Sequence, residues 1–288
     1  MKQLSLFIEL IRIKKPIGFM LLFWPCAWGL TIAYDFKNNL NLYFFYLTLF
    51  FLGAVLMRSA GCIVNDIFDK KYDKQVFRTK NRPIASGQIS IKLAILYSCV
   101  LCFLALLILL NFNLFTIFLA LASMPLAFTY PLMKRFTYWP QLFLGITFNY
   151  GLILGWTAVN GEINLIPFIF YLGAIFWTLG YDTIYGYQDI KDDEIIGLKS
   201  TSLKFKDKGI NFLIASYFIF ILVLIVLGYM MQFTKYYYFF LIISFSHLFL
   251  YQIKNLDLKK PYMCLLTFNK NNSFGCVVLI NIFIGKFF

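Results

Sequence analysis

The sequence predicts an all-α integral membrane protein. Of its 288 residues, 61% are hydrophobic and only 14% are charged, whereas a soluble domain has about 45–50% apolar and about 25% charged residues. Apolar runs of about 20 residues, the length that crosses a bilayer as a helix, recur along the chain. Lys and Arg gather in alternate connecting segments, as they do in multi-pass proteins. The lipid bilayer must therefore cover most of the surface.

Nine of these apolar runs are candidate transmembrane helices. The last two are the weakest, because Lys235 and His247 interrupt the apolar character of one and the C-terminal run is short. Prolines at or near the ends of several runs are compatible with membrane helices. The expected spans are residues 17–34, 43–64, 93–111, 114–132, 140–159, 165–184, 211–231, 236–252 and 274–288.

The distribution of basic residues predicts the orientation. If the N-terminus is cytosolic and the spans alternate, 22 of the 26 Lys and Arg lie in cytosolic segments. Only Lys37, Lys235 and Lys286 lie outside, and Arg58 lies within the second span. This split follows the positive-inside rule and predicts a cytosolic N-terminus and an outer C-terminus. It also accounts for the net charge of +13 without a nucleic-acid partner.

The chain is expected to form one transmembrane domain over residues 1–288, with aspartate-rich loops at about 65–91 and 182–210. Eight of the 13 acidic residues lie in two short windows within these loops. Acidic groups at the mouth of a membrane helix are costly and indicate a function. The windows contain Asp66, Asp69 and Asp73, and then Asp182, Asp189, Asp192, Asp193 and Glu194.

The spacing of the first window places its carboxylates on one helix face. Asp66, Asp69 and Asp73 are at positions i, i+3 and i+7 of a helix that continues out of the second span. A similar spacing at the end of the sixth span is shown by Asp182, Tyr185, Asp189 and Asp193. Two facing carboxylate stripes repel each other unless a cation lies between them.

Oxygen ligands of this kind predict a Mg²⁺–diphosphate site. Mg²⁺ prefers one or two carboxylates together with waters and substrate phosphates. Basic residues beside both windows suit the diphosphate, although the positive-inside rule explains any one of them alone. The candidate diphosphate-binding residues are Lys70, Arg78, Arg82, Lys134, Arg135 and Lys199, together with Arg58, Asn65 and Tyr185.

Arg58 is a separate case, because it lies inside the second span. It precedes Asp66 by eight residues, or about 12 Å along a helix. A guanidinium at that depth must pair with another group or line a wet cavity. Three interpretations remain open: Arg58 binds the diphosphate, it binds the carboxylate of the molecule that accepts the transferred group, or it pairs with a neighbouring helix.

These motifs resemble those of the UbiA superfamily of membrane prenyltransferases, and most closely its 4-hydroxybenzoate polyprenyltransferases of ubiquinone synthesis. The stretch from Asn65 to Asp73 meets the family's N-D-x-x-D-x-x-x-D pattern in full. The second motif is matched from Tyr181 to Asp193, although Lys191 separates Asp189 from Asp192. Two further segments, 130–141 and 12–18, are similar to the hydroxybenzoate group.

The resemblance implies a fold of nine transmembrane helices around a central cavity, capped on the cytosolic side. It implies Mg²⁺-dependent transfer of a polyprenyl group from polyprenyl diphosphate to the carbon ortho to the hydroxyl of 4-hydroxybenzoate. It also implies a bacterial inner membrane as the location.

The resemblance further implies roles for individual residues. Asn65, Asp66 and Asp69 would hold one Mg²⁺, and Asp189 with Asp193 the other, with the part played by Asp192 left open. A carboxylate, Asp73 or Asp193, would accept the proton from the acceptor.

Three alternatives remain to be weighed. Other members of the superfamily, making menaquinone, heme O or a chlorophyll tail, would share the fold and the metal chemistry, but segment 130–135 favours hydroxybenzoate. CDP-alcohol phosphotransferases also carry clustered aspartates, but their D-G-x-x-A-R motif does not occur in this sequence. A cation transporter would place its ligands near the bilayer midplane rather than at one face.

Overall fold

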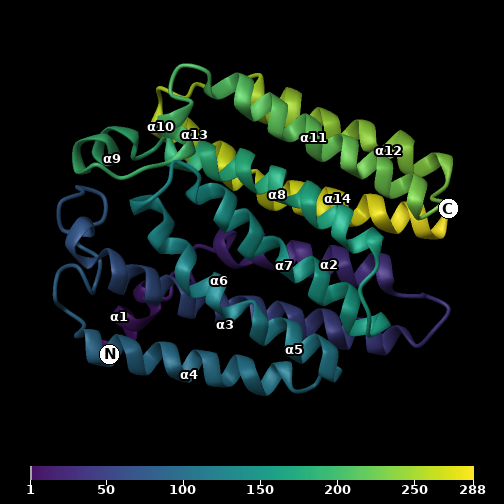
Figure 1. Cartoon of the computed structure of the whole chain (residues 1–288), viewed down its shortest axis with the longest axis horizontal. Helices are drawn as coiled ribbons and strands as arrows, with labels where there is room; N and C mark the ends of the chain where they lie inside the picture. Colours follow the sequence, from purple (N-terminus) through teal and green to yellow (C-terminus); the bar gives the residue numbers. More distant parts are fainter. Residues whose placement is uncertain (1) are drawn as a thin grey trace.

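The structure is a computed structural model that describes residues 2–288. All regular elements in this range are helices, which confirms the all-α prediction (Figure 1). They are α1 (Lys2–Leu10), α2 (Ile17–Ala33), α3 (Leu40–Asp73), α4 (Ile91–Leu109), α5 (Leu114–Ala122), α6 (Met124–Thr129), η1 (Tyr130–Arg135), α7 (Pro140–Asn160), α8 (Leu165–Gly186), α9 (Ile190–Ile196), α10 (Thr201–Lys204), α11 (Gly209–Met230), α12 (Lys235–Ser246), η2 (His247–Ile253), α13 (Pro261–Asn269) and α14 (Asn271–Phe287).

Seven helical segments in the described part of the chain are long and apolar enough to cross a membrane. They correspond to the second to eighth expected spans. The first and ninth correspond to α2 and α14, which have 17 residues each. The chain is therefore a multi-pass membrane protein, and nine is an approximate number of spans.

Two of the expected spans are not continuous α-helices. α5 ends at Ala122 and α6 begins at Met124, with Pro125 in its first turn. Proline lacks an N–H and its ring clashes with the preceding turn, so the helix breaks there. The eighth span passes from α12 into the π-helical segment η2.

α3 carries the first acidic window out of the membrane region. It begins after Asn39, whose side chain accepts a hydrogen bond from the Asn41 N–H at 2.9 Å. It then runs for 34 residues without interruption to Asp73, well beyond residue 64, where the span was expected to end. The prediction that one helix continues from the span through the aspartates is confirmed.

α2 and α7 pack closely at the centre of the bundle. A Cβ on Gly29 would overlap the Leu152 carbonyl, and a Cβ on Gly155 would overlap the backbone of Cys26 and Leu30. Small residues allow two membrane helices to approach at backbone distance. The glycines are therefore what lets α2, and with it the N-terminal segment, lie against α7.

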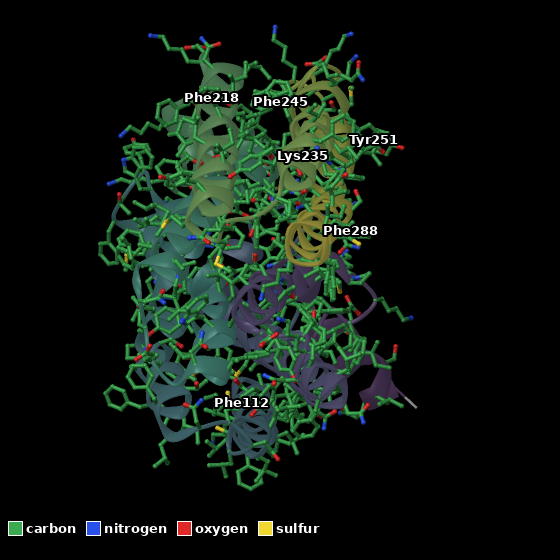
Figure 2. The ribbon with its side chains drawn as sticks, turned by 90° about the vertical axis from the view of Figure 1, so that its right-hand side faces the viewer. Phe112, Phe218, Lys235, Phe245, Tyr251 and Phe288 are labelled. Atoms are coloured by element: carbon green, nitrogen blue, oxygen red, sulfur yellow. The ribbon has the colours of Figure 1, made fainter. Side chains whose placement is uncertain are left out.

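The interior of the bundle is aromatic. Trp28, Trp177, Phe170 and Phe220 are fully buried, and their rings stack or tilt against one another with centroids 5.0–6.5 Å apart. Large apolar side chains also cover the outside, as expected for contact with lipid. Phe218, for example, is 50% exposed on α11 (Figure 2).

Candidate active site

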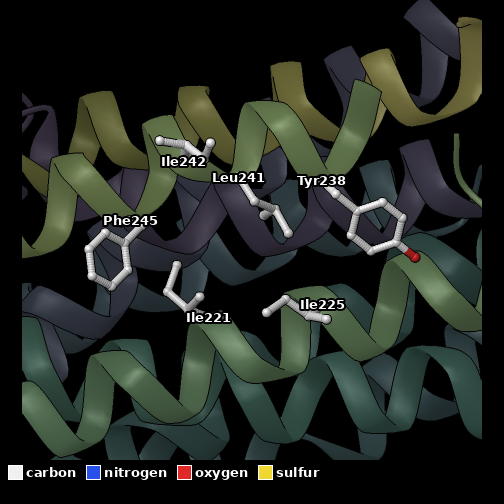
Figure 3. A pocket seen from close by; sticks show the side chains of 6 residues that line it. All are labelled: Ile221, Ile225, Tyr238, Leu241, Ile242 and Phe245. Carbon is white, nitrogen blue, oxygen red and sulfur yellow. The ribbon is translucent and has the colours of Figure 1, made fainter. Parts of the chain in front are cut away.

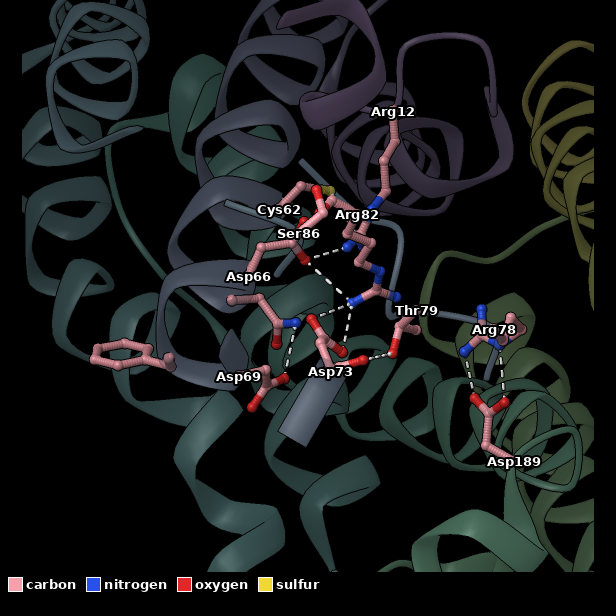
Figure 4. Close-up of polar contacts among 12 residues, drawn as sticks. Arg12, Cys62, Asp66, Asp69, Asp73, Arg78, Thr79, Arg82, Ser86 and Asp189 are labelled. Atoms are coloured by element: carbon pink, nitrogen blue, oxygen red, sulfur yellow. Dashed lines mark hydrogen bonds and ion pairs between the residues drawn. The ribbon is translucent and has the colours of Figure 1, made fainter. Parts of the chain in front are cut away.

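Three aspartates of α3 lie together at one end of the bundle, each beside a basic side chain (Figure 4). Asp66 and Asp73 are 2% and 7% exposed. Asp66 accepts hydrogen bonds from Arg12 and, at 3.2 Å, from Arg82. Arg82 also donates to both oxygens of Asp73, at 2.9 and 3.1 Å. Buried carboxylates need counter-charges, and these guanidinium groups supply them.

Asp69, on the same face, contacts residues of two helices. Its Oδ2 accepts hydrogen bonds from Lys134 on η1 and, at 3.1 Å, from the Asn65 side chain. Its Oδ1 is buried and has no hydrogen-bond partner in the described residues, although Arg135 lies 3.8 Å away. One oxygen of Asp69 therefore remains available to a further ligand.

Arg78 connects the two acidic windows. Its guanidinium donates to both oxygens of Asp189, and Nη1 donates to the Tyr185 hydroxyl at 3.3 Å (Figure 4). Burial would lower the pKa of Arg78, but Asp189 and Tyr185 raise it, so this side chain stays charged. The loop after α3 and the end of α8 are thus at the same end of the bundle, as the sequence predicts.

Asp193 lies one turn beyond Asp189 and differs from the other aspartates. Its backbone N–H donates to the Asp189 carbonyl at 2.9 Å. Burial and the adjacent Asp189 charge together raise the pKa of its carboxyl to about 6, while Lys134 opposes the shift. Asp73 is held by Arg82, and both carboxyls remain predicted proton acceptors.

Arg58 lies deeper in the bundle and makes no ion pair among the described residues. Its Nε is buried without a hydrogen-bond partner. The guanidinium stands over the Phe148 ring at 5.5 Å, and a Cβ on Gly18 would come within 2.8 Å of Nε. Asp182 of α8 is close enough for its charge to interact with Arg58, although the two form no ion pair within 4 Å. A pairing with this neighbouring helix therefore stays open beside the two anion-binding interpretations.

Two predicted site residues are not brought to the carboxylates. Lys199 donates instead to the Phe136 carbonyl at 3.2 Å, and no ion pair of Lys70 occurs in the described part of the chain. Conversely, the sequence did not single out Arg12, which pairs with Asp66. Its backbone is left-handed, with φ of 55°, a rare conformation outside glycine that no sequence motif indicates.

The donor set fits Mg²⁺. Within residues 2–288, no three His, Cys, Asp or Glu side chains are close enough to hold an ion by themselves. Mg²⁺ does not require this, because it usually keeps waters and phosphate oxygens beside one or two carboxylates. The oxygen-only chemistry, with the buried and unbonded Asp69 Oδ1, matches that preference. Asn65, Asp66, Asp69, Asp189 and Asp193 remain the predicted ligands.

A groove away from the aspartate-rich end is apolar rather than charged. An apolar groove between α11 and α12 is lined by Ile221, Ile225, Tyr238, Leu241, Ile242 and Phe245 (Figure 3). It has no charged lining residue and opens onto the outer apolar surface. Tyr238 supplies its one polar side chain and it has no carboxylate, so the aspartate-rich end is the candidate active site.

Comparison with known proteins points to one family. Residues 22–274 match the UbiA prenyltransferase family. The chain is 43% identical over 286 residues to a mitochondrial 4-hydroxybenzoate polyprenyltransferase of Bos taurus, covering 99% of this chain and 76% of that protein. It is 38% identical over 296 residues to 4-hydroxybenzoate geranyltransferase 1 of Lithospermum erythrorhizon, covering 100% and 92% of the two chains.

The fold is also found among solved structures. A UbiA homologue from Archaeoglobus fulgidus, bound to GPP and Mg²⁺, superposes with a TM-score of 0.73 at 16% identity. The match covers 98% of this chain and 99% of that one. At this identity the likeness concerns the fold alone, and it agrees with the helical bundle described above.

Proposed function

Because this chain belongs to the UbiA prenyltransferase family, we propose that it transfers a polyprenyl group from polyprenyl diphosphate to 4-hydroxybenzoate, at the carbon ortho to the hydroxyl, in ubiquinone synthesis. One observation carries this proposal. Two aspartate-rich segments meet at one end of the bundle, above an arginine that has no ion-pair partner in the described residues. The first feature suits a metal diphosphate, and the second suits the carboxylate of the acceptor.

The diphosphate end of the reaction is assigned to the aspartates and their basic neighbours. Asn65, Asp66 and Asp69 would hold one Mg²⁺, and Asp189 with Asp193 the other. When bound, Mg²⁺ neutralises the negative charge that the departing diphosphate develops. Arg78 and Lys134 contact these carboxylates now, and both are near enough to donate to diphosphate oxygens in the same place.

The acceptor is assigned to the space below the aspartates. Arg58 precedes Asp66 by two helical turns, about 12 Å along α3. A benzoate whose carboxylate binds Arg58 would direct its hydroxylated end toward the diphosphate. The apolar surroundings exclude water, which would otherwise capture an allylic cation. Asp73 or Asp193 is the proposed acceptor of the proton released by the ring.

We also propose an orientation in the membrane, from the distribution of basic residues. The loops at the active-site end contain most of the Lys and Arg, so the positive-inside rule places this end and the N-terminus on the cytosolic side, or on the matrix side in a mitochondrion. The Bos taurus relative is named as mitochondrial. This finding gives no support to the expectation of a bacterial inner membrane.

The proposed reaction is tested with membranes that contain the protein and a labelled polyprenyl diphosphate. We expect labelled prenyl hydroxybenzoate only when both 4-hydroxybenzoate and Mg²⁺ are present. Chelation with EDTA should abolish product formation, and added Mg²⁺ should restore it. Product that forms at the same rate in EDTA, or no product with any prenyl chain length, would contradict the proposal.

The role of Arg58 leads to a separate prediction. In Arg58→Gln the carboxylate of the acceptor loses its charged partner, and a charge-assisted hydrogen bond is worth about 1.5–3 kcal/mol. We expect KM for 4-hydroxybenzoate to rise by about tenfold to a hundredfold, with KM for polyprenyl diphosphate changed by less than about twofold. Steady-state kinetics with each substrate varied in turn distinguishes these effects. An equal rise in both KM values would show that Arg58 does not act on the acceptor.

A further inference from the structure

A lysine outside the proposed active site lies at the junction of α13 and α14, against the π-helical segment η2. The Lys270 Nζ donates to the Tyr251 carbonyl at 2.7 Å and stands 3.9 Å from the centre of the Tyr251 ring. Tyr251 is in the last turn of η2, where backbone carbonyls have few helical donors. The ammonium group is thus held in place at one point on the surface.

Three more side chains adjoin this lysine. The His247 Nε2 and the Ser273 hydroxyl are 3.0 Å apart, and the His247 and Tyr251 rings are 5.2 Å apart. The Ser273 hydroxyl also donates to the Lys270 carbonyl at 2.7 Å. His247, Tyr251, Lys270 and Ser273 therefore form one continuous surface, which we call the Lys270 patch.

The Lys270 patch has a positive charge without a balancing negative charge. No ion pair of Lys270 occurs in residues 2–288, and Asp257, in the preceding loop, pairs with Lys260 at 3.4 Å. The Ser273 hydroxyl donates to the Lys270 carbonyl and hydrogen-bonds to His247, so the ammonium is the group of the patch that is left to face an anion. A fixed ammonium is a suitable partner for a phosphate group.

The surroundings of the Lys270 patch indicate where such an anion would come from. Leu250, Leu265 and Leu266, from the two adjoining helical segments, are 54%, 39% and 44% exposed. Tyr251, labelled in Figure 2, is 52% exposed. These exposed apolar groups belong to the lipid-facing surface. An anion that reaches Lys270 among them is therefore part of a lipid.

The position along the membrane normal also fits a lipid headgroup. Phe268 of α13 contacts the Tyr185 ring, with centroids 4.7 Å apart, and Tyr185 is the hydrogen-bond partner of Arg78 at the active-site end. Lys270 follows Phe268 by two residues, or about 3 Å along a helix. The backbone of Lys270 lies deeper, since the next residue contacts Trp177, but the ammonium reaches the Tyr251 carbonyl at the end of the eighth span, near the membrane surface.

We propose that the Lys270 patch binds the headgroup phosphate of an anionic phospholipid. The ammonium of Lys270 keeps two N–H groups after its bond to the Tyr251 carbonyl, and these attract the phosphate and donate to its oxygens. Ser273 and His247 hold the surrounding backbone in place. The lipid tails then lie along the exposed leucines of η2 and α13. A basic site at the membrane surface is a typical means of selecting anionic lipids over neutral ones.

The contacts behind the patch connect it to the candidate active site. Asn271, the next residue, accepts a hydrogen bond from the Trp177 indole of α8 at 2.9 Å and donates to Gln252 at 3.2 Å. With Phe268 packed on Tyr185, α13 joins the lipid-facing patch to the end of α8. A bound lipid therefore stabilises the position of Tyr185. Faster prenyl transfer in anionic membranes is the expected consequence, and this part alone rests on the proposed function.

The binding claim is tested on the full chain in nanodiscs or detergent, without turnover. The probes are short-chain fluorescent phosphatidylglycerol and phosphatidylcholine. We expect the wild type to bind phosphatidylglycerol at least about fivefold more tightly than phosphatidylcholine, as one nearby lysine predicts. Lys270→Gln should lose this preference, and Lys270→Arg should retain it if the charge is what matters.

Lys235→Gln is the matched control. Lys235 is also a surface lysine beside a tyrosine ring, at 5.7 Å, but it begins α12 at the end far from η2. The control should bind both lipids as the wild type does. Equal binding of the two lipids by the wild type, or an unchanged preference in Lys270→Gln, would overturn the proposal. Displacement of the lipid by millimolar inorganic phosphate would show instead that the patch is a site for free phosphate.

Discussion

Replacing Asp66 by asparagine is expected to reduce prenyl transfer by on the order of a thousandfold, which corresponds to about 4 kcal/mol of transition-state stabilisation. Asparagine has nearly the same shape, so the change removes the charge and little else. It takes away a predicted metal ligand and leaves Arg12 and Arg82 without their shared carboxylate. Initial rates with purified protein at saturating Mg²⁺ and polyprenyl diphosphate measure the effect.

Glu194→Gln is the matched control for this experiment. Glu194 is in the second acidic window, but its side chain is 56% exposed and pairs with Lys206 at 2.7 Å, away from the aspartates. An exposed ion pair contributes about 0–1 kcal/mol, so the control should retain nearly full activity. If Asp66→Asn folds normally and works as fast as this control, the metal role of the first window is wrong.

A large loss of stability is expected from Gly155→Ala. The new methyl group would overlap the backbone of α2 at Cys26 and Leu30, and backbone cannot move aside as a flexible side chain can. Overpacking a close interface costs about 1–3 kcal/mol or more. For a chain of this size we expect the unfolding midpoint in detergent to fall by about 5 °C or more.

Gly53→Ala provides the comparison. A Cβ on Gly53 would meet no atom within 4 Å, and alanine is the better helix former by about 1 kcal/mol. Its midpoint should be unchanged or slightly raised. Both midpoints are measured by the same thermal scan, followed by fluorescence. Equal midpoints for the two variants would mean that α2 and α7 are not in backbone contact.

Much of the architecture could be predicted from the sequence, because a bilayer imposes strong constraints. The apolar runs predicted most spans to within a few residues, although α3 extends nine residues past its expected end. The i, i+3, i+7 spacing of Asp66, Asp69 and Asp73 correctly placed them on one helical face. The helix breaks were less predictable. Proline explains the break at Pro125, whereas the π-helical turn of η2 depends on packing between spans that a periodic pattern does not reveal.

The pairing of charges could not be predicted in detail. The sequence placed basic residues near the aspartates, but it did not show that Arg78 would contact Asp189, or that Lys199 would turn toward a backbone carbonyl. These choices depend on how loops cross the end of the bundle. Arg12 was missed for the same reason, since its approach to Asp66 requires a left-handed backbone and the packing of α1 on α3.

The contact between Arg78 and Asp189 has a consequence for the synthesis of the protein. The two residues are 111 positions apart, so a ribosome that has delivered only the first five spans has made half of a catalytic centre. An allylic diphosphate that meets such a fragment finds no second set of carboxylates. Under the proposed function, a translation product that stops early is inert, and prenyl transfer begins only once the sixth span has entered the bilayer.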